Sequence, residues 1–132
     1  MKRSKRLQVI VDIKATQEQK ALEVLGQSQR QHTQMKGQVE GLSSYRSDYV
    51  DQCNAFAKGG VKVSRLIEFR SFIDKLDIAI TGQEKILKNM EQDVLLKRKT
   101  WETMYQHTQT IQKVRESALK VERHHENKRE QH

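Results

Sequence analysis

The sequence predicts an all-α protein, a long antiparallel two-helix coiled-coil hairpin. Three observations support this fold class. The chain of 132 residues contains no proline, apolar residues recur in alternating steps of three and four, and the pattern is interrupted by the adjacent glycines Gly59 and Gly60. A 3.5-residue repeat sustained over many heptads is typical of helices that pack along one narrow stripe and supercoil around a partner.

The first apolar stripe predicts a helix over about residues 5–57. Most of its slots are apolar, but polar residues recur between Lys14 and His32, where we expect weaker pairing and fraying towards the open end. The slots are Leu7, Val11, Lys14, Glu18, Ala21, Leu25, Ser28, His32, Met35, Val39, Leu42, Arg46, Tyr49, Cys53 and Phe56.

A short turn is predicted over about residues 58–63. Gly59 and Gly60 can end the first helix through a left-handed cap, and Ser64 is the candidate N-cap of the next helix. Because so short a connection reverses the chain, the two helices should lie side by side.

The second stripe predicts a helix over about residues 63–124, followed by a flexible C-terminal tail. At 1.5 Å per residue the two helices would be roughly 80 and 90 Å long, forming a thin rod and a single domain over residues 1–132. The slots are Leu66, Phe69, Ile73, Leu76, Ile80, Gln83, Leu87, Met90, Val94, Lys97, Trp101, Met104, Thr108, Ile111, Arg115 and Ala118.

The composition argues against a globular enzyme. Only 35% of the residues are apolar and 32% are charged, which is too little apolar content for a compact multilayer core. The carboxylates are scattered among basic residues, and no Gly-rich phosphate loop occurs. The adjacent His124 and His125 point to different helix faces, so no metal site is expected. We therefore expect no catalytic residues, no metal and no cofactor.

The termini and the cysteine content suggest a cytoplasmic protein. No apolar run of about 18 residues and no signal-peptide stretch occurs, so no direct membrane insertion is expected. The single cysteine, Cys53, lies on the first stripe, where packing is the expected role.

One flank of the predicted helix pair is apolar and the other is charged. Folding about the glycines places Tyr45 near Phe72 and Leu42 near Leu76. The resulting patch is a candidate protein interface, although the same side chains could simply broaden the contact between the two helices. The patch consists of Gln38, Leu42, Tyr45, Tyr49, Phe72, Leu76, Ala79 and Gln83.

The spacing of these residues resembles the FliJ family of flagellar export proteins. The similarity rests on Gln38-x3-Leu42-x2-Tyr45-x3-Tyr49, on Phe72-Ile73-x2-Leu76-x2-Ala79-Ile80-x2-Gln83, on Trp101, and on the opening run Arg6-Leu7-Gln8-Val9-Ile10-Val11-Asp12. It covers nearly the whole chain. Gln83 departs from the histidine that some members carry at that slot.

The resemblance implies a stalk-like coiled coil of the type III export apparatus. Such proteins insert their terminal end into the ring of the export ATPase FliI, promote its assembly, contact the export gate protein FlhA and bind export chaperones. The gate-binding surface of the family carries over to the patch defined above. The resemblance also implies a position at the inner membrane through the export apparatus.

Two other classes of function remain open. The formal net charge of +8 suggests an anionic partner, so the chain could be a basic coiled coil that binds nucleic acid or an anionic membrane. We expect no nucleic acid as partner, because aromatic residues do not interleave with the basic ones. Alternatively, the apolar flank could close a homodimeric structural coiled coil.

Overall fold

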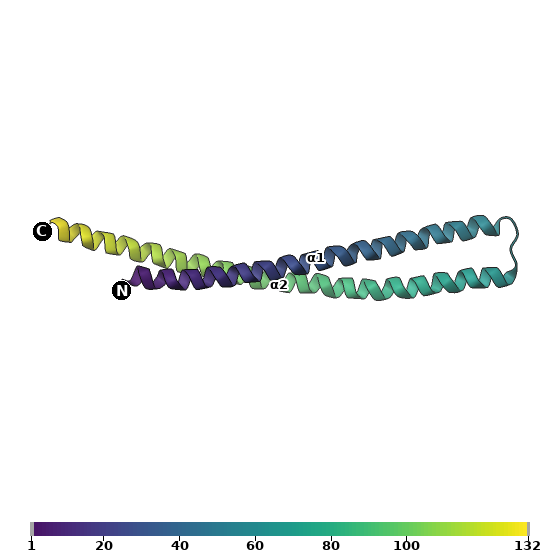
Figure 1. Ribbon diagram of the computed structural model, residues 1–132, viewed down its shortest axis with the longest axis horizontal. Coiled ribbons are helices and arrows are strands. Elements are labelled where there is room, and N and C mark those ends of the chain that lie inside the picture. Colours follow the sequence, from purple (N-terminus) through teal and green to yellow (C-terminus); the bar gives the residue numbers. More distant parts are fainter. Residues whose placement is uncertain (1, 132) are drawn as a thin grey trace. The chain divides into compact units, whose positions relative to one another are not determined.

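The computed structural model describes residues 2–131 and consists of two α-helices (Figure 1). Helix α1 spans Arg3–Ala57 and helix α2 spans Val63–Gln131. Within the described residues there is no strand. The predicted fold class, an all-α helical hairpin, is confirmed.

Helix α2 extends beyond the end that the apolar stripe predicts. The expected helix end near residue 124 is wrong, since residues 125–131 continue the helix to Gln131, and the flexibility of this C-terminal segment stays a prediction. This segment contains Glu, Lys, Arg and Gln, which favour helix without needing an apolar face. Lys128 and Arg129 occupy the last turn, where the helix dipole favours cations. His132 lies outside the described residues.

The predicted glycine turn is confirmed. Gly60 has a φ of 86°, in the left-handed region that residues with a Cβ adopt only at a cost. The N–H of Gly59 donates to the carbonyl of Phe56 (3.3 Å), and the N–H of Gly60 donates to the carbonyl of Ala57 (3.1 Å). These bonds satisfy carbonyl groups that the end of α1 would otherwise leave without a partner.

Ser64 does not cap α2, so the predicted N-cap is wrong. The carbonyl of Lys62 accepts the first hydrogen bonds, from the N–H groups of Arg65 (3.0 Å) and Leu66 (3.3 Å). Because α2 begins at Val63, Ser64 lies inside the first turn. A side-chain cap must come from the residue just before the helix.

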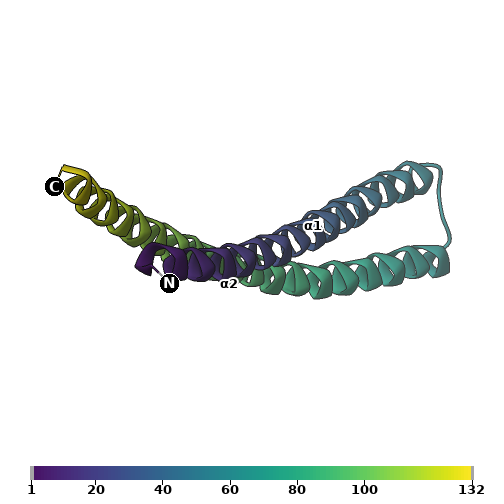
Figure 2. The same cartoon turned by 60° about the vertical axis from the view of Figure 1, so that its left-hand side comes forward.

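The chain divides into two compact units. The hairpin unit comprises Ser28–Val94, and the terminal unit comprises the described chain up to Gln27 and from Leu95 onwards. Within each unit, a segment of α1 runs antiparallel to a segment of α2 (Figures 1 and 2). The single coiled-coil domain that the sequence suggests stays a prediction.

The predicted apolar stripes form the contact between the helical segments of each unit. Every slot of both stripes is buried or half-buried except Phe56 and Leu66. Among the described residues no large side chain is fully buried, because a pair of helices can cover only one side of its own seam. The buried slots are Val11, Leu25, Ser28, Val39, Cys53, Leu76, Ile80, Thr108 and Ala118.

Polar side chains also join the helices where the seam is least apolar. In the hairpin unit, the Ser28 hydroxyl donates to Asp93 (2.8 Å), and His32 Nε2 lies 3.4 Å from a Glu91 carboxylate oxygen. These contacts lie in the part of the first stripe where weaker pairing is expected. They show how polar slots are accommodated there without apolar packing.

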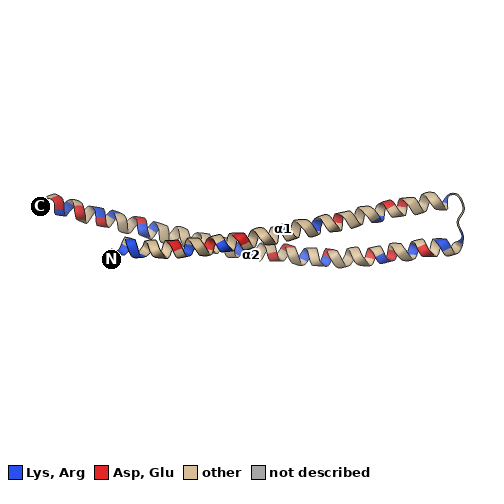
Figure 3. Ribbon diagram, viewed as in Figure 1, with Lys and Arg blue, Asp and Glu red and all other residues tan. Residues whose placement is uncertain are grey.

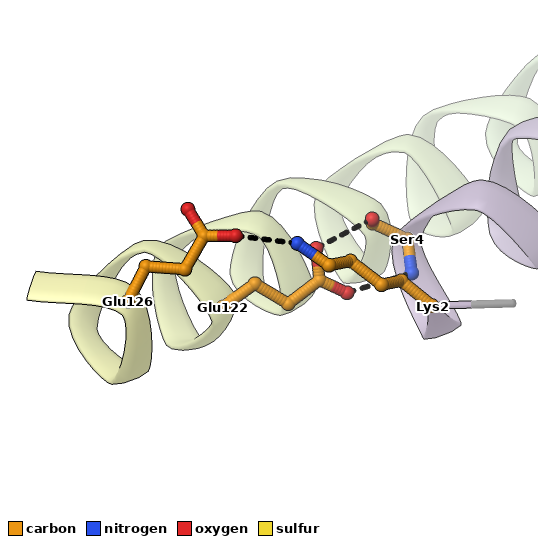
Figure 4. A network of polar contacts seen from close by, with 4 residues as sticks. All are labelled: Lys2, Ser4, Glu122 and Glu126. Atoms are coloured by element: carbon orange, nitrogen blue, oxygen red, sulfur yellow. Dashed lines mark hydrogen bonds and ion pairs between the residues drawn. The ribbon is translucent and has the colours of Figure 1, made fainter. Parts of the chain in front are cut away.

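In the terminal unit, Lys2 and the first turn of α1 contact two carboxylates of α2 (Figure 4). Ser4 is buried, and Glu122 accepts hydrogen bonds from its hydroxyl (2.6 Å) and from its N–H (3.1 Å). Lys2 Nζ lies 2.5 Å from Glu126 Oε1. These contacts oppose separation of the two ends, whose fraying stays a prediction.

Candidate protein-binding surface

The candidate site belongs to the hairpin unit, and we call it the tyrosine face. It contains the eight residues that the helix phase predicts as a patch, contributed by both helices. They are Gln38, Leu42, Tyr45 and Tyr49 from α1 and Phe72, Leu76, Ala79 and Gln83 from α2.

Three aromatic rings form the centre of the tyrosine face. Tyr45 and Tyr49 are one helical turn apart on α1 and stack with their centroids 6.4 Å apart. The Phe72 ring of α2 contacts both, with centroids 4.7 Å from Tyr49 and 6.5 Å from Tyr45. Tyr49 also meets Phe69 edge-on at 6.3 Å. The predicted pairing of Tyr45 with Phe72 across the hairpin is therefore confirmed.

The eight residues differ in how far they reach the surface. Tyr45 is 51% exposed and Phe72 is 37% exposed. Leu76 is only 8% exposed, so it lies in the seam and supports the face from below instead of forming part of its surface. Of the others, Gln38 and Ala79 are exposed, whereas Leu42, Tyr49 and Gln83 are half-buried.

Gln83 has an unused acceptor at the edge of the tyrosine face. Its Oε1 atom is buried and has no hydrogen-bond partner among the described residues. A buried polar atom without a partner costs on the order of 1–3 kcal/mol. Because this atom is closed to solvent, a donor of a bound partner could reach it only after the Gln83 side chain turns outwards.

Tyr49 connects the exposed rings to the seam. Burial raises the pKa of its phenol, and a hydrogen bond with the Cys53 thiol raises it further. Tyr49 therefore stays neutral at physiological pH. Beside these two residues lies a shallow hollow of about 210 Å³ whose other lining residues are Gln52, Phe56, Arg65 and Phe69. It is small for a drug-sized ligand and of a size for a side chain of a partner.

An ion pair between α1 and α2 lies in the same unit as the tyrosine face. The Arg46 guanidinium donates two hydrogen bonds to the Asp77 carboxylate, one from Nε and one from Nη2 (3.2 Å). This contact with Asp77 raises the pKa of Arg46. Both side chains are more than a third exposed, so this ion pair contributes little to stability. Its main effect is to fix how the two helices lie against each other. The sequence predicted a charged flank of the helix pair but not this pairing.

Sequence reasoning also missed a second group of exposed apolar residues, next to the turn. Phe56 and Leu66 were expected in the seam but are 59% and 43% exposed. Val63 and Ile67, one turn apart on α2, are 72% and 64% exposed. Val63 and Ile67 are spaced i, i+4, so they share a helix face, and neither lies on the stripe. This spacing was the signal available in the sequence.

Two other kinds of site are not found among the described residues. They contain no cluster of three or more His, Cys, Asp or Glu side chains able to hold a metal ion. In the same part of the chain, neither helix has an apolar stretch long enough to cross a membrane.

The fold is a coiled-coil hairpin, and the tyrosine face exposes the aromatic side chains of Tyr45 and Phe72. The family model described as "Flagellar FliJ protein" matches residues 3–132. The chain therefore belongs to the FliJ family, and it is a component of flagellar protein export. It is 26% identical over 110 residues to the flagellar FliJ protein of Escherichia coli strain K12, covering 83% of this chain and 75% of that relative. No solved structure gives a significant match.

Proposed function

We propose that this chain is a non-enzymatic adaptor of the flagellar type III export apparatus. In this role it links the ring of the export ATPase FliI to the export gate protein FlhA, promotes assembly of the ATPase and binds export chaperones. Membership of the FliJ family supports this role at the level of flagellar export. The two units of the hairpin offer separate surfaces for two partners.

The gate protein is proposed to bind the tyrosine face. The observation that carries this assignment is the exposure of Tyr45 and Phe72, whose rings contact each other and remain open to solvent. Tyrosine and other aromatic residues are frequent anchors of protein interfaces. The proposed contact residues are Gln38, Leu42, Tyr45, Tyr49, Phe72, Ala79 and Gln83, and Leu76 supports them from the seam.

The ATPase is proposed to bind the terminal unit. Basic residues cluster in the first turns of α1, as Figure 3 shows in blue, and their field suits an acidic ring lumen. Further basic side chains occur in the part of α2 that belongs to this unit. The candidates are Lys2, Arg3, Lys5, Arg6 and Lys14 with Arg115, Lys120 and Arg123, together with the acidic Asp12.

Binding to the gate and to the ATPase would hold the chain at the cytoplasmic side of the inner membrane. On this proposal the export apparatus supplies its peripheral location there.

A binding experiment with both partners tests this proposal. The Tyr45→Ala variant should lose affinity for the cytoplasmic domain of the gate protein by roughly thirtyfold or more, because an exposed aromatic anchor is removed. Its affinity for the ATPase should not change. Isothermal titration calorimetry with each purified partner measures both affinities.

Tyr105→Ala is the matched control. Tyr105 is 43% exposed and belongs to the terminal unit, where it packs against Trp101 with centroids 5.7 Å apart. Removing it should leave gate binding unchanged. Equal losses for the two tyrosine variants, or a loss of helicity in Tyr45→Ala measured by circular dichroism, would contradict an anchor role for Tyr45.

The two alternative classes predict different measurements. A chain that binds nucleic acid through its +8 charge should lose affinity steeply between low and moderate salt, through counterion release. A homodimer closed by the apolar flank should show a mass that rises with concentration in analytical ultracentrifugation.

A further inference from the structure

Four large apolar side chains are exposed beside the turn of the hairpin unit. Phe56 at the end of α1 is 59% exposed, and Val63, Leu66 and Ile67 at the start of α2 are 72%, 43% and 64% exposed. Exposed apolar residues that occur singly need no explanation, but Val63, Leu66 and Ile67 lie within one turn of α2 on the same face, and such a group indicates a binding surface. We call these four residues, together with Lys58, Lys62 and Arg65, the turn tip.

The charged residues of the turn tip all carry the same sign. Residues 52–67 contain three basic residues and no aspartate or glutamate, and Figure 3 shows blue on both sides of the turn. The nearest carboxylate that contacts the tip is that of Glu68, 3.7 Å from the Arg65 guanidinium. Both side chains of this pair are more than half exposed, so it neutralises the tip only weakly.

We infer that the turn tip is a docking site for an anionic phospholipid surface. Apolar side chains flanked by lysine and arginine suit the boundary between headgroups and acyl chains. The apolar groups enter that boundary while the long basic side chains extend to the phosphates. A turn that joins two helices can dock on a surface that has no preformed cavity. A fluid bilayer offers such a surface. An acidic groove on another protein is the competing occupant.

This contact differs from the two activities proposed above and does not depend on them. It uses no residue of the tyrosine face and none of the terminal unit, and it shares only Phe56 and Arg65 with the hollow beside Tyr49. It also requires no helix that spans the membrane, since an interfacial contact reaches only headgroup depth. The contact revises the expectation of no direct membrane insertion to that limited extent.

Co-sedimentation of the full chain with vesicles tests the docking site. The chain should sediment with phosphatidylcholine vesicles that contain about 30% phosphatidylglycerol and remain in the supernatant with phosphatidylcholine alone. Replacing Lys58, Lys62 and Arg65 by glutamine should weaken binding on the order of 100-fold, at about fivefold per charge. The matched control replaces Lys75, Lys85 and Lys88 by glutamine, which removes the same net charge away from the tip.

A second pair of variants tests the apolar part of the turn tip. Ile67→Asn should weaken binding to the acidic vesicles about tenfold, because the isoleucine side chain no longer enters the lipid boundary. Ile78→Asn is the matched control, because Ile78 is 73% exposed on the same helix but lies outside the tip. Circular dichroism should show equal helicity for both variants.

Fluorescence distinguishes lipid contact from attraction at a distance. In a Trp101→Phe background, Val63→Trp places the single tryptophan in the tip, and its emission should shift to the blue with acidic vesicles. The inference is overturned if the chain does not sediment with acidic vesicles, and this result would favour a protein groove as the occupant. It is equally overturned if the tip variants and their controls bind alike, or if the tryptophan emission does not shift.

Discussion

Leu76 and Ile78 lie two positions apart on α2, yet the first is 8% exposed and the second 73% exposed. Two residues correspond to a rotation of about 200° around a helix, so these side chains point to nearly opposite faces. Leu76 belongs to the predicted stripe and Ile78 does not. At the scale of single residues, position on the stripe decides what a substitution will do.

Leu76→Asp should therefore unfold the hairpin unit, because it places a charge in the seam with no partner. We expect a loss of about 3 kcal/mol or more in the free energy of unfolding. Ile78→Asp, two residues away, should change stability by less than about 0.5 kcal/mol. Thermal unfolding followed by circular dichroism compares the two, and similar melting temperatures would show that the stripe is wrongly placed.

The tyrosine face shows which features of a surface can be predicted from the phase of the helices. Tyr45 and Phe72 are exposed as their flanking positions require. Leu76 is a seam residue that the same pattern also assigns to the patch, and packing against α1 buries it. The pairing of Arg46 with Asp77 was not predicted, because the pattern specifies faces and not which long side chains meet across them.

At the scale of the elements, the chain reverses between α1 and α2 at two glycines that have different backbone conformations. Gly60 has a φ of 86°, whereas Gly59 is not in the positive-φ region. A Cβ on Gly59 would meet the Phe56 carbonyl oxygen at 3.7 Å, an ordinary contact distance. A Cβ on Gly60 would meet nothing within 4 Å, so its cost comes from the backbone alone.

Gly60→Ala should destabilise the hairpin unit by about 1–2 kcal/mol, because alanine is strained in the left-handed region. Gly59→Ala should cost much less and serves as the control. Urea unfolding of the two variants gives both values. If Gly59→Ala were the more harmful of the two, the left-handed turn at Gly60 would not be what reverses the chain.

The ends of the helices were harder to predict than their faces. Ser64 has the right residue type for an N-cap, but α2 begins at Val63 and includes it. Residues 125–131 carry no apolar stripe and are nevertheless helical. In both cases the stripe marks where a helix is packed, whereas its ends depend on local backbone hydrogen bonds and on helix propensity.

At the scale of the whole molecule, contacts in the terminal unit join the beginning of the chain to its end. The hydrogen bonds from Ser4 lower the pKa of the Glu122 carboxyl, and the hydrogen bond from Lys2 lowers that of Glu126. The same contact with Glu126 raises the pKa of Lys2. The charged forms of Glu122, Glu126 and Lys2 therefore stabilise the contact between the two paired ends.

The sign of the pH dependence follows from these shifts. The two carboxylates contribute fully to the stability of the paired ends above their unfolded pKa of 4.5. This contribution is lost as the pH falls through their lowered pKa values. Lys2 contributes fully below 10.5, and its contribution is lost as the pH rises through its raised value. The paired ends should thus separate in acid and at high pH, with modest effects because the groups are exposed.

A carboxyl titration by NMR checks this prediction. Glu122 should titrate below 4.5, and Ser4→Ala should return its pKa towards that value. An identical titration of Glu122 with and without the serine hydroxyl would contradict the assigned cause.

The sequence by itself determined the hairpin, the faces of both helices and the exposed tyrosine and phenylalanine of the tyrosine face. It did so because burial along a helix follows a fixed angular period that is visible in the order of residues. Only the tertiary structure decided that Phe56 and Leu66 stay exposed beside the turn, and that Ser4 and Arg46 meet carboxylates of the other helix. These features depend on the distance and register between two helices, which residues far apart in the chain set together.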